Sequence, residues 1–216
     1  MHTRVRRHGD YGIDAPIVVR NLFFAGVAAM IAGAISRYLL AEKCPVIVWI
    51  LLIWGLFAGA SMLVTAVLMV WSSKIGKLRL RERLIDLLSL RGTETILDVG
   101  CGRGLLLNAA ARRLTTGKAI GIDQSGNHPE ATLANARAEG VADVVEVKTG
   151  DMRKLPFEDE TIDVVVSSLA IHNIPTKEGR LQAIQEIARV LKPGGRVALL
   201  DFQHTEEYAQ ALRALG

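Results

Sequence analysis

The feature that most constrains this chain is an uncharged apolar run from Val46 to Trp71. As one helix, these 26 residues would be ~39 Å long, and the hydrocarbon core of a bilayer is ~30 Å thick. Trp49 and Trp71 lie near the two ends of the run, where indole rings favour the membrane interface. Because a water-soluble domain of this size has no need of such a helix, the run predicts a transmembrane span.

A second apolar run, Leu22 to Ala41, comes before it and is interrupted only by Arg37, whose stem could reach the headgroups from near the end of a span. The polar turn Glu42-Lys43-Cys44-Pro45 separates the two runs, and Pro45 can begin the second helix. Small residues would let two helices approach closely; they include Gly26, Gly33, Gly55 and Gly59. We therefore predict a transmembrane hairpin over residues 21–73, in preference to a cleaved signal peptide or a buried soluble hairpin.

Basic residues flank the apolar region and account for much of the net charge of +4. They are Arg4, Arg6, Arg7 and Arg20 before it, and Lys74, Lys77, Arg79, Arg81 and Arg83 after it. By the positive-inside rule, residues 1–20 form a cytoplasmic tail and the rest of the chain after the hairpin is also cytoplasmic. The expected location is a multi-pass membrane protein, with the bacterial inner membrane as the host. This clustering favours a membrane surface over nucleic acid as the partner.

Residues 74–92 form an amphipathic run in which leucines and Ile85 alternate with basic residues. It predicts a linker helix along the inner membrane surface. A helix packed on the following domain is the alternative, and the two are compatible.

Two cysteines, Cys44 and Cys101, are too few for a disulfide framework, and no Cys/His cluster has zinc spacing. We expect no metal site.

From Thr95 onward, short β-branched runs alternate with helical stretches. Strands are expected at 96–99, 118–122, 144–147, 162–166 and 196–200, and helices at 105–114, 129–139, 179–191 and 205–215. This alternation predicts an α/β domain over residues 93–216 with a doubly wound, mostly parallel sheet. Ligands of such sheets bind at the carboxyl ends of the strands, so the residues that follow each strand are the candidates for a site.

The residues in those places are unusual. The first strand leads into Asp98-Val99-Gly100-Cys101-Gly102-Arg103-Gly104, a turn that lets a ligand lie on the backbone before a helix begins. The second ends at Asp123, where a carboxylate can bind both hydroxyls of a ribose. The third leads to Asp151 and Met152. Since Leu105 stands where a dinucleotide turn has its third glycine, and no P-loop lysine is present, the ligand expected is an adenosine without a pyrophosphate.

These residues resemble class I S-adenosylmethionine-dependent methyltransferases, in particular the group that methylates small molecules and quinone-like lipids. Ile96 to Gly104 is similar to the first motif of that family, and Gly121-Ile122-Asp123 to the acidic second motif. Gly150-Asp151-Met152 with Leu155-Pro156-Phe157 resembles the adenine-binding segment, and Leu191-Lys192-Pro193-Gly194-Gly195 the turn before the fifth strand. The resemblance spans about residues 84–202 and implies S-adenosylmethionine as the cofactor.

The resemblance also implies a role for each residue that matches a motif. The glycines Gly100, Gly102 and Gly104 would lie under the methionine part, with Asp98 near its amino group. Asp123 would bind the ribose, Asp151 the adenine amino group, and Met152 the adenine ring, while Ser167 would face the sulfonium. Cys101, as steric filling of the turn, and Gln124 complete the expected cofactor contacts.

The acceptor side is less well defined. Ser168, His172 and Asn173 follow the fourth strand. His172 is the candidate catalytic residue, a general base, because an unperturbed histidine has a pKa of about 6.5. The competing interpretation is that His172 only holds the loop after the strand.

The family sheet has two further strands after the fifth, whereas here one helix follows it, so the fifth strand is expected to be an open edge of the sheet.

The leading hypothesis is a membrane-anchored methyltransferase that acts on a small or lipophilic acceptor. The alternative is a non-catalytic, membrane-tethered cofactor-binding scaffold or sensor. A nicotinamide-dependent oxidoreductase is disfavoured by the glycine spacing. A nucleic-acid methyltransferase is disfavoured because no Asn/Asp-Pro-Pro-aromatic tetrad follows the fourth strand. The sequence does not indicate an oligomeric state.

Overall fold

A computed structural model describes residues 9–40, 42, 44–124 and 129–215. Arg4, Arg6, Arg7, Lys43 and the loop 125–128 therefore lie outside the described residues. The chain divides into two compact units. One is Gly12–Arg79, and the other is Leu80–Gly216 together with the segment that ends at Tyr11. Each unit is considered by itself.

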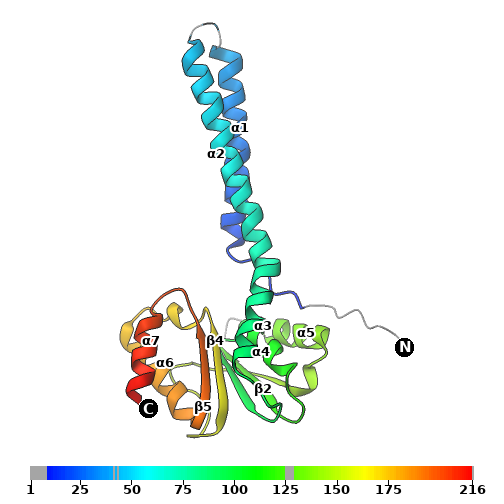
Figure 1. The fold of residues 1–216 in the computed structure, drawn as a ribbon, viewed down its shortest axis with the longest axis vertical. Helices are drawn as coiled ribbons and strands as arrows, with labels where there is room; N and C mark the ends of the chain where they lie inside the picture. The colour runs from blue at the N-terminus through cyan, green and yellow to red at the C-terminus, as the bar shows by residue number, and fades with distance from the viewer. Residues whose placement is uncertain (1–8, 41, 43, 125–128, 216) are drawn as a thin grey trace, which may run out of the picture. The chain divides into compact units, whose positions relative to one another are not determined.

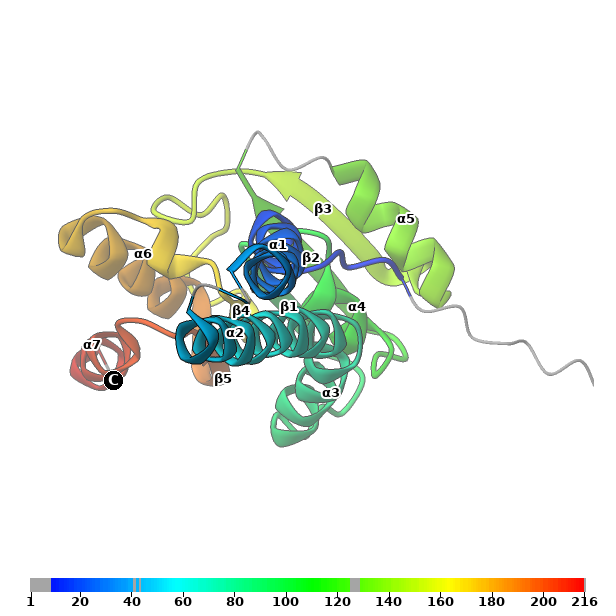
Figure 2. The same cartoon turned by 90° about the horizontal axis from the view of Figure 1, so that it is seen from above.

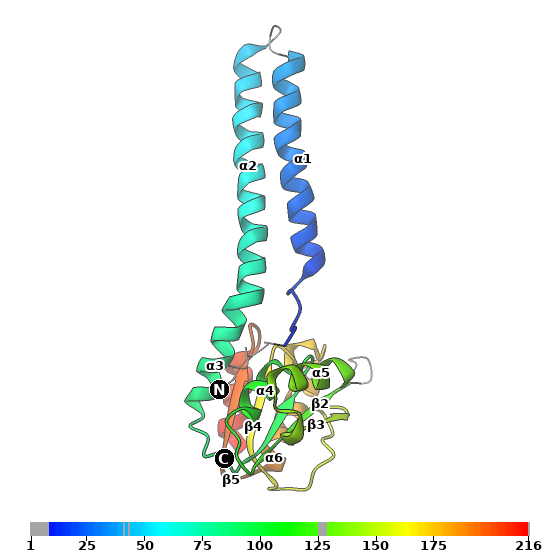
Figure 3. The same ribbon diagram turned by 90° about the vertical axis from the view of Figure 1, so that its right-hand side faces the viewer.

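The first unit is an antiparallel helical hairpin of α1 (Pro16–Leu40) and α2 (Pro45–Trp71) (Figures 1 and 3). α2 begins at Pro45, as the sequence predicted, because a proline suits the first turn of a helix. α1 begins six residues before the predicted Leu22 because Pro16 also suits a first turn, and the charge of Arg20 does not end the helix.

Small residues let the two helices approach closely, as predicted. A Cβ added to Gly26 would lie 2.9 Å from the carbonyl oxygen of Gly59, and one added to Gly55 would lie 2.7 Å from that of Ala29. At the turn end of the hairpin, the guanidinium of Arg37 lies 5.3 Å from the ring centre of Trp49. At the other end, Asp14 accepts from Lys77 Nζ at 2.9 Å and from the Ser73 hydroxyl at 3.2 Å.

The outward faces of the hairpin are apolar and uncovered. In the most hydrophobic window of each helix, 11% of the residues are buried. Phe24, Trp54 and Phe57 have 62%, 68% and 74% of their surface exposed. By length and composition, the two helices are candidate membrane spans. A π-helical turn, η1 (Ser72–Gly76), follows α2 and leads into α3 (Lys77–Leu87).

The second unit is an α/β domain built on a sheet of five parallel strands. These are β1 (Thr95–Val99), β2 (Lys118–Asp123), β3 (Val145–Thr149), β4 (Ile162–Ser168) and β5 (Leu191–Leu200). Their order is β3-β2-β1-β4-β5, with every neighbouring pair parallel. The predicted Rossmann-like fold is confirmed, and in the described part of the chain no sixth strand pairs with β5.

Helices cover both faces of this sheet (Figure 2). They are α3, α4 (Leu105–Ala111) and α5 (Pro129–Glu139) on one face, and α6 (Lys177–Val190) and α7 (Thr205–Leu215) on the other. Short 3₁₀ turns, η2 (Ala142–Val144) and η3 (Ile171–Asn173), precede β3 and follow β4. Alternate residues of β1 serve the two faces: Ile96 packs with α3 and α4, whereas Leu97 packs with α6.

α3 is a packed helix of this domain. Ile85 on α3 and Leu88, just beyond its end, are 1% and 5% exposed and join the same cluster as Ile96. This confirms the alternative interpretation of the amphipathic run, in which its apolar side covers the sheet. The helix ends at Leu87, five residues before the end of the predicted run at residue 92.

The fifth strand differs from the sequence prediction at its start. Leu191 already pairs with Ile162, and the regular register resumes with Arg196 opposite Val164. Between the two pairs lies an irregularity at which Gly194 has φ of +75°. The predicted turn 191–195 is therefore part of an irregular strand, because the first residue of the segment finds a partner on β4.

Glu94 ties the start of β1 to β5 and makes a testable contribution to stability. It is 6% exposed and accepts from the backbone N–H groups of Arg91 and Gly92 and from Arg196 Nη2, at 2.7, 2.8 and 2.9 Å. Burial alone would raise the pKa of Glu94, but these donors lower it from 4.5 to about 2. The resulting stabilisation, at most about 3 kcal/mol, is present above pH ~4.5 and is lost as the pH falls toward 2.

We predict that Glu94→Gln lowers the free energy of unfolding by about 2 kcal/mol at pH 7. The difference from the wild type should shrink between pH 4.5 and pH 2. Denaturant unfolding followed by circular dichroism measures it. The control is Glu146→Gln, because the Glu146 side chain is 48% exposed and its ion pairs are worth less than about 1 kcal/mol. Equal effects of the two substitutions at pH 7 would contradict the prediction.

Candidate active site

The turn after β1 forms the centre of the candidate site. The backbone N–H groups of Gly100 and Cys101 both donate to the carbonyl oxygen of Ile122, at 2.8 and 3.1 Å. Gly104 N–H then donates to Cys101 O at 2.7 Å, and α4 begins at the next residue. The turn is thereby fixed between the carboxyl ends of β1 and β2, the place that the sequence predicted.

Two glycines of this turn are required for different reasons. Gly100 has φ of +74°, and a Cβ there would collide with the side chain of Ala170, in the loop after β4. Gly102 has φ of +50°, and among the described residues the nearest atom to a Cβ there is Asp123 Oδ2, at 3.9 Å. Gly100 thus allows protein to pack against the turn, whereas the described residues leave the space over Gly102 open.

Asp123 lies at the end of β2 with its carboxylate held against the turn. Oδ2 accepts from Gly102 N–H at 2.5 Å, and Oδ1 accepts from Gln124 N–H at 2.8 Å. The side chain is partly exposed. The carboxylate of Asp123 therefore lies beside Gly102, at the end of β2 where the sequence predicted it. The contact with a ribose stays a prediction.

Asp98 has a structural partner beneath the turn. It is 2% exposed, and its Oδ2 accepts from the backbone N–H of Leu107 in the first turn of α4, at 2.9 Å. Burial raises the pKa of Asp98 to about 7, and the negative charge of Asp123 adds to the effect. Asp98 therefore holds the first turn of α4 through the N–H of Leu107. Its contact with the amino group of the cofactor stays a prediction.

Cys101 and Met152 fill the space behind the turn. Cys101 is 6% exposed, and burial raises the pKa of its thiol, so the side chain is a poor nucleophile at neutral pH. Met152 is 7% exposed, and its Cε lies 3.4 Å from the position of a Cβ on Gly100. The steric role expected for Cys101 agrees with its burial. The packing of Met152 on an adenine ring stays a prediction.

Asp151 is paired with a residue that the sequence analysis missed. Its Oδ2 lies 2.6 Å from Arg153 Nη2, and Oδ1 accepts from the Arg153 backbone N–H at 2.9 Å. The hydrogen bonds from Arg153 lower the pKa of Asp151. The carboxylate is 38% exposed, so an adenine amino group would share it with Arg153.

Ser167 is placed at the predicted end of β4, but its hydroxyl is already occupied. The residue is 2% exposed, and Oγ donates to the carbonyl oxygen of Val99 at 2.6 Å. This bond ties β4 to the end of β1 just before the glycine turn. A direct contact between Ser167 and a sulfonium stays a prediction.

His172 forms a pair with Asp201, a second residue that the sequence analysis missed. Nδ1 of His172 lies 2.7 Å from Asp201 Oδ1. The backbone N–H groups of His172 and Phe202 also donate to the Asp201 carboxylate, at 3.2 and 2.8 Å. Asp201 directly follows β5, so the rule that places ligands at the carboxyl ends of strands could have found it.

The surroundings of His172 are apolar and close to the glycine turn. Its ring centre lies 4.4 Å from that of Phe202, which is 67% exposed. Leu169, on the same loop, is 47% exposed. Ala170, two residues before His172, packs on Gly100. The loop after β4 thus brings a candidate base and exposed apolar side chains to the edge of the turn.

These residues fit an adenosine-containing cofactor with a methionine part. Gly102 leaves room for a ligand on the backbone, and the carboxylate of Asp123 lies next to that room.

We predict that Gly102→Ala weakens S-adenosylmethionine binding at least tenfold, because the new methyl group enters the open space. The backbone strain at φ of +50° should cost about 1–2 kcal/mol of stability. Calorimetric titration gives the affinity, and denaturant unfolding gives the stability. Gly104→Ala is the matched control, since its Cβ would lie 2.7 Å from Thr132 Cγ2 and should chiefly destabilise the fold. Wild-type affinity in a folded Gly102→Ala protein would be the contrary result.

Residues 96–195 match the family model described as a methyltransferase domain. The chain is 37% identical over 126 residues to the 27-O-demethylrifamycin SV methyltransferase of Amycolatopsis mediterranei, which covers 57% of this chain and 44% of that protein. It is 33% identical over 128 residues to the demethylmenaquinone methyltransferase of Lactiplantibacillus plantarum, with 59% and 53% covered. The chain spans about half the length of these curated relatives.

Among solved structures, the YcgJ protein of Bacillus subtilis is similar with a TM-score of 0.51 and 29% identity, over 58% of this chain and 50% of that one. The cyclase SpnF is similar with a TM-score of 0.55 and 27% identity, over 64% and 57%. Since SpnF is named for a cyclisation, likeness of fold alone does not specify methyl transfer. The family match over residues 96–195 and the sequence relatives support a class I S-adenosylmethionine-dependent methyltransferase domain in the α/β unit of this chain.

Proposed function

We propose that this protein is a membrane-anchored methyltransferase that transfers the methyl group of S-adenosylmethionine to a small, lipophilic acceptor. The observation that carries the proposal is the glycine turn, which has the carboxylate of Asp123 beside Gly102 and the loop of His172 packed against Gly100 through Ala170. A cofactor surface and a candidate proton acceptor thus meet at one edge of the parallel sheet.

The residues around His172 support an apolar acceptor. Leu169 and Phe202 are two of the few large apolar side chains that the described part of this domain leaves exposed, and an exposed apolar patch marks a binding surface. The names of two relatives point the same way, since one acts on a demethylmenaquinone and another on a demethylrifamycin. The acceptor class we infer is an aromatic or quinone-like molecule with an ionisable hydroxyl.

The bound cofactor supplies a methyl group that is already activated on a sulfonium, so the protein mainly aligns the acceptor and excludes water. The turn at Gly102 and the carboxylate of Asp123 would bind it. Nδ1 of His172 lies 2.7 Å from Asp201 Oδ1 without hydrogen-bond geometry; in the tautomer with the proton on Nδ1, Nε2 would accept a proton from the acceptor hydroxyl. The cofactor, when bound, would supply the methyl group for transfer from its sulfonium to the oxygen of the acceptor hydroxyl. His172 would hold the proton that this hydroxyl loses, and Asp201 would stabilise the resulting imidazolium.

The test is methyl transfer by the detergent-purified full-length protein, with radiolabelled S-adenosylmethionine and an extract of membrane lipids that contains reduced quinones. We expect label in an organic-soluble product and one equivalent of S-adenosylhomocysteine. Saturable binding of the cofactor without transfer to any fraction of the extract would instead favour the non-catalytic scaffold. Absence of cofactor binding by a folded protein would overturn the proposal.

For the base itself, we predict that His172→Gln lowers the turnover rate about 10²-fold, because general base catalysis contributes about that much. Asp201→Asn should lower it less, since Asp201 acts through His172. The affinity for S-adenosylmethionine should stay at the wild-type value in both variants. If His172 only holds the loop, His172→Gln will lower thermal stability and leave the turnover rate per folded molecule unchanged.

The membrane anchor is the second part of the proposal, and α1 and α2 support it. Their outward faces carry exposed apolar side chains such as Phe24, Trp54 and Phe57, which water would solvate at a cost of about 1.5–3 kcal/mol each. Two spans connected by a short turn would leave both ends of the hairpin on one side of the bilayer, and the basic residues assign that side to the cytoplasm.

We predict that the full-length protein stays in the membrane fraction after washing at high salt and at alkaline pH. Replacement of Leu52, Ile53 and Leu56 in α2 by arginine should release it, because each buried arginine costs about 2.5–3.5 kcal/mol at the centre of a span. Release of the wild-type protein by high salt alone would mean that the basic residues hold it at the surface and that the helices do not span.

A further inference from the structure

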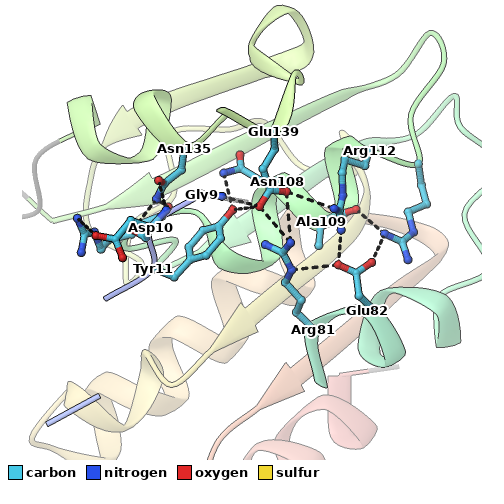
Figure 4. A network of polar contacts seen from close by, with 12 residues as sticks. Gly9, Asp10, Tyr11, Arg81, Glu82, Asn108, Ala109, Arg112, Asn135 and Glu139 are labelled. Atoms are coloured by element: carbon cyan, nitrogen blue, oxygen red, sulfur yellow. Dashed lines mark hydrogen bonds and ion pairs between the residues drawn. The ribbon is translucent and has the colours of Figure 1, made fainter. Parts of the chain in front are cut away.

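A short segment before the hairpin binds to the methyltransferase domain on helix α5 (Figure 4). The backbone N–H of Asp10 donates to Asn135 Oδ1 at 2.8 Å, and Asn135 Nδ2 donates to the carbonyl oxygen of Asp10 at 3.1 Å. Asn135 is 6% exposed. A side-chain amide that pairs with both backbone groups of one residue fixes that residue as an adjacent strand would. We refer to Gly9–Tyr11 as the strap.

Asn135 connects the strap to the glycine turn. The same Nδ2 donates to the carbonyl oxygen of Arg103 at 2.9 Å. Thr132, one turn earlier on α5, donates from Oγ1 to the carbonyl oxygen of Gly102 at 2.5 Å. The two carbonyl groups in the middle of the turn are therefore held by α5, and one of the two bonds comes from the side chain that holds the strap.

Tyr11 fixes the other end of the strap to a buried carboxylate. Its hydroxyl donates to Glu139 Oε1 at 2.7 Å and accepts from Asn108 Nδ2 at 3.1 Å. Burial raises the pKa of Tyr11 to about 12, and Glu139 adds to the effect, so this hydroxyl keeps its proton. The guanidinium of Arg81 lies 5.0 Å from the centre of the Tyr11 ring and donates to Glu139 Oε1 at 3.0 Å.

Glu139 therefore binds residues from both segments that border residues 12–79 in the chain: Tyr11, directly before them, and Arg81, two residues after them. Its side chain is 2% exposed. Glu139 also accepts from the backbone N–H of Gly9 at 3.3 Å, and its Oε2 lies 3.5 Å from Arg112 Nη1. Release of the strap would therefore remove the donors of Gly9 and Tyr11 from a buried carboxylate, which is costly, while Arg81 and Arg112 stay paired with it.

We propose that the strap is a positioning element for the cofactor, and that Asn135 and Tyr11 are its positioning residues. With the strap bound, the carbonyl groups of Gly102 and Arg103 are fixed, and the turn is pre-organised for the ligand. With the strap released, the side chain of Asn135 is free to rotate. Part of the free energy of cofactor binding is then used to order the turn, so the affinity falls. The affinity for S-adenosylmethionine is then set in part by a segment that does not touch the open space over Gly102. This inference rests on the proposed function.

The first test needs no cofactor. In the full-length protein, hydrogen exchange of the backbone amides in residues 102–108 is compared between the wild type and Tyr11→Phe, which removes one oxygen atom and keeps the ring under Arg81. We expect exchange in this segment to rise about fivefold, the equivalent of one lost hydrogen bond. Unchanged exchange in residues 102–108 would overturn the proposal, whether or not the protein binds S-adenosylmethionine.

The second test measures the dissociation constant of S-adenosylmethionine by calorimetry and the turnover rate at saturating cofactor. Tyr11→Phe and Asn135→Ala should each raise the dissociation constant about three- to tenfold, with the saturated turnover rate unchanged. The double variant should add little to Asn135→Ala, since both changes act through the strap. Equal affinity in all three variants and the wild type would overturn the proposal.

Lys192→Ala is the matched control, because it removes one ion pair, to Asp163 at 2.7 Å, far in sequence from the strap and the turn. It should leave both exchange in 102–108 and the dissociation constant unchanged. If it raises them as much as Tyr11→Phe does, general destabilisation explains the effect and the proposal is wrong. If the wild type binds no S-adenosylmethionine, the proposed function fails, and the exchange measurement alone decides the role of the strap.

Discussion

The parallel order of the strands is the constraint on which the candidate site depends. All five strands run in one direction, so the segments that leave β1, β2, β4 and β5 emerge at one edge of the sheet. The chain order reverses beside β1, with β2 on one side and β4 on the other, which leaves a place where neighbouring loops diverge. The glycine turn, Asp123, His172 and Asp201 come from four different strands and share this edge for that reason alone.

Buried polar side chains near this edge make hydrogen bonds within the protein, which leaves them less available to a ligand. Asp98 and Ser167 are both 2% exposed, and each bonds a backbone group. An unpaired buried carboxylate or hydroxyl would cost about 1–3 kcal/mol or more, so burial decides their first role. Asp123 differs because it is partly exposed while its two oxygens accept from the backbone. The residues at this edge of the sheet therefore fall into two groups. The buried ones hold the turn in place, and the partly exposed ones can contact a ligand.

This distinction also explains what the sequence could and could not predict. Short β-branched runs, the helical stretches between them and the glycine spacing predicted the strands, the helix Pro129–Glu139 and the position of Asp123, because local patterns determine them. Asp201 was missed although it follows a predicted strand, since an acidic residue after β5 has no motif around it. The contact between Asn135 and Asp10 had no local signal at all: the two residues lie 125 positions apart, and only the packed fold brings them together. The start of β5 was placed five residues late because Leu191 owes its pairing to Ile162, a tertiary contact.

The proposed membrane anchor and the proposed lipophilic acceptor fit together because both would be concentrated at the membrane. A lipophilic acceptor partitions into the bilayer, with a gain of about 0.8 kcal/mol for each buried CH₂ group. A soluble domain would meet such an acceptor rarely, whereas a domain joined covalently to two spans shares the surface where the acceptor is concentrated. The gain requires no contact between the hairpin and the acceptor. It requires only an active-site edge that tolerates an apolar molecule, and the exposed side chains of Leu169 and Phe202 beside His172 meet that condition. Under the proposed function, the hairpin of exposed apolar helices and the exposed apolar side chains beside His172 would both follow from one kind of substrate.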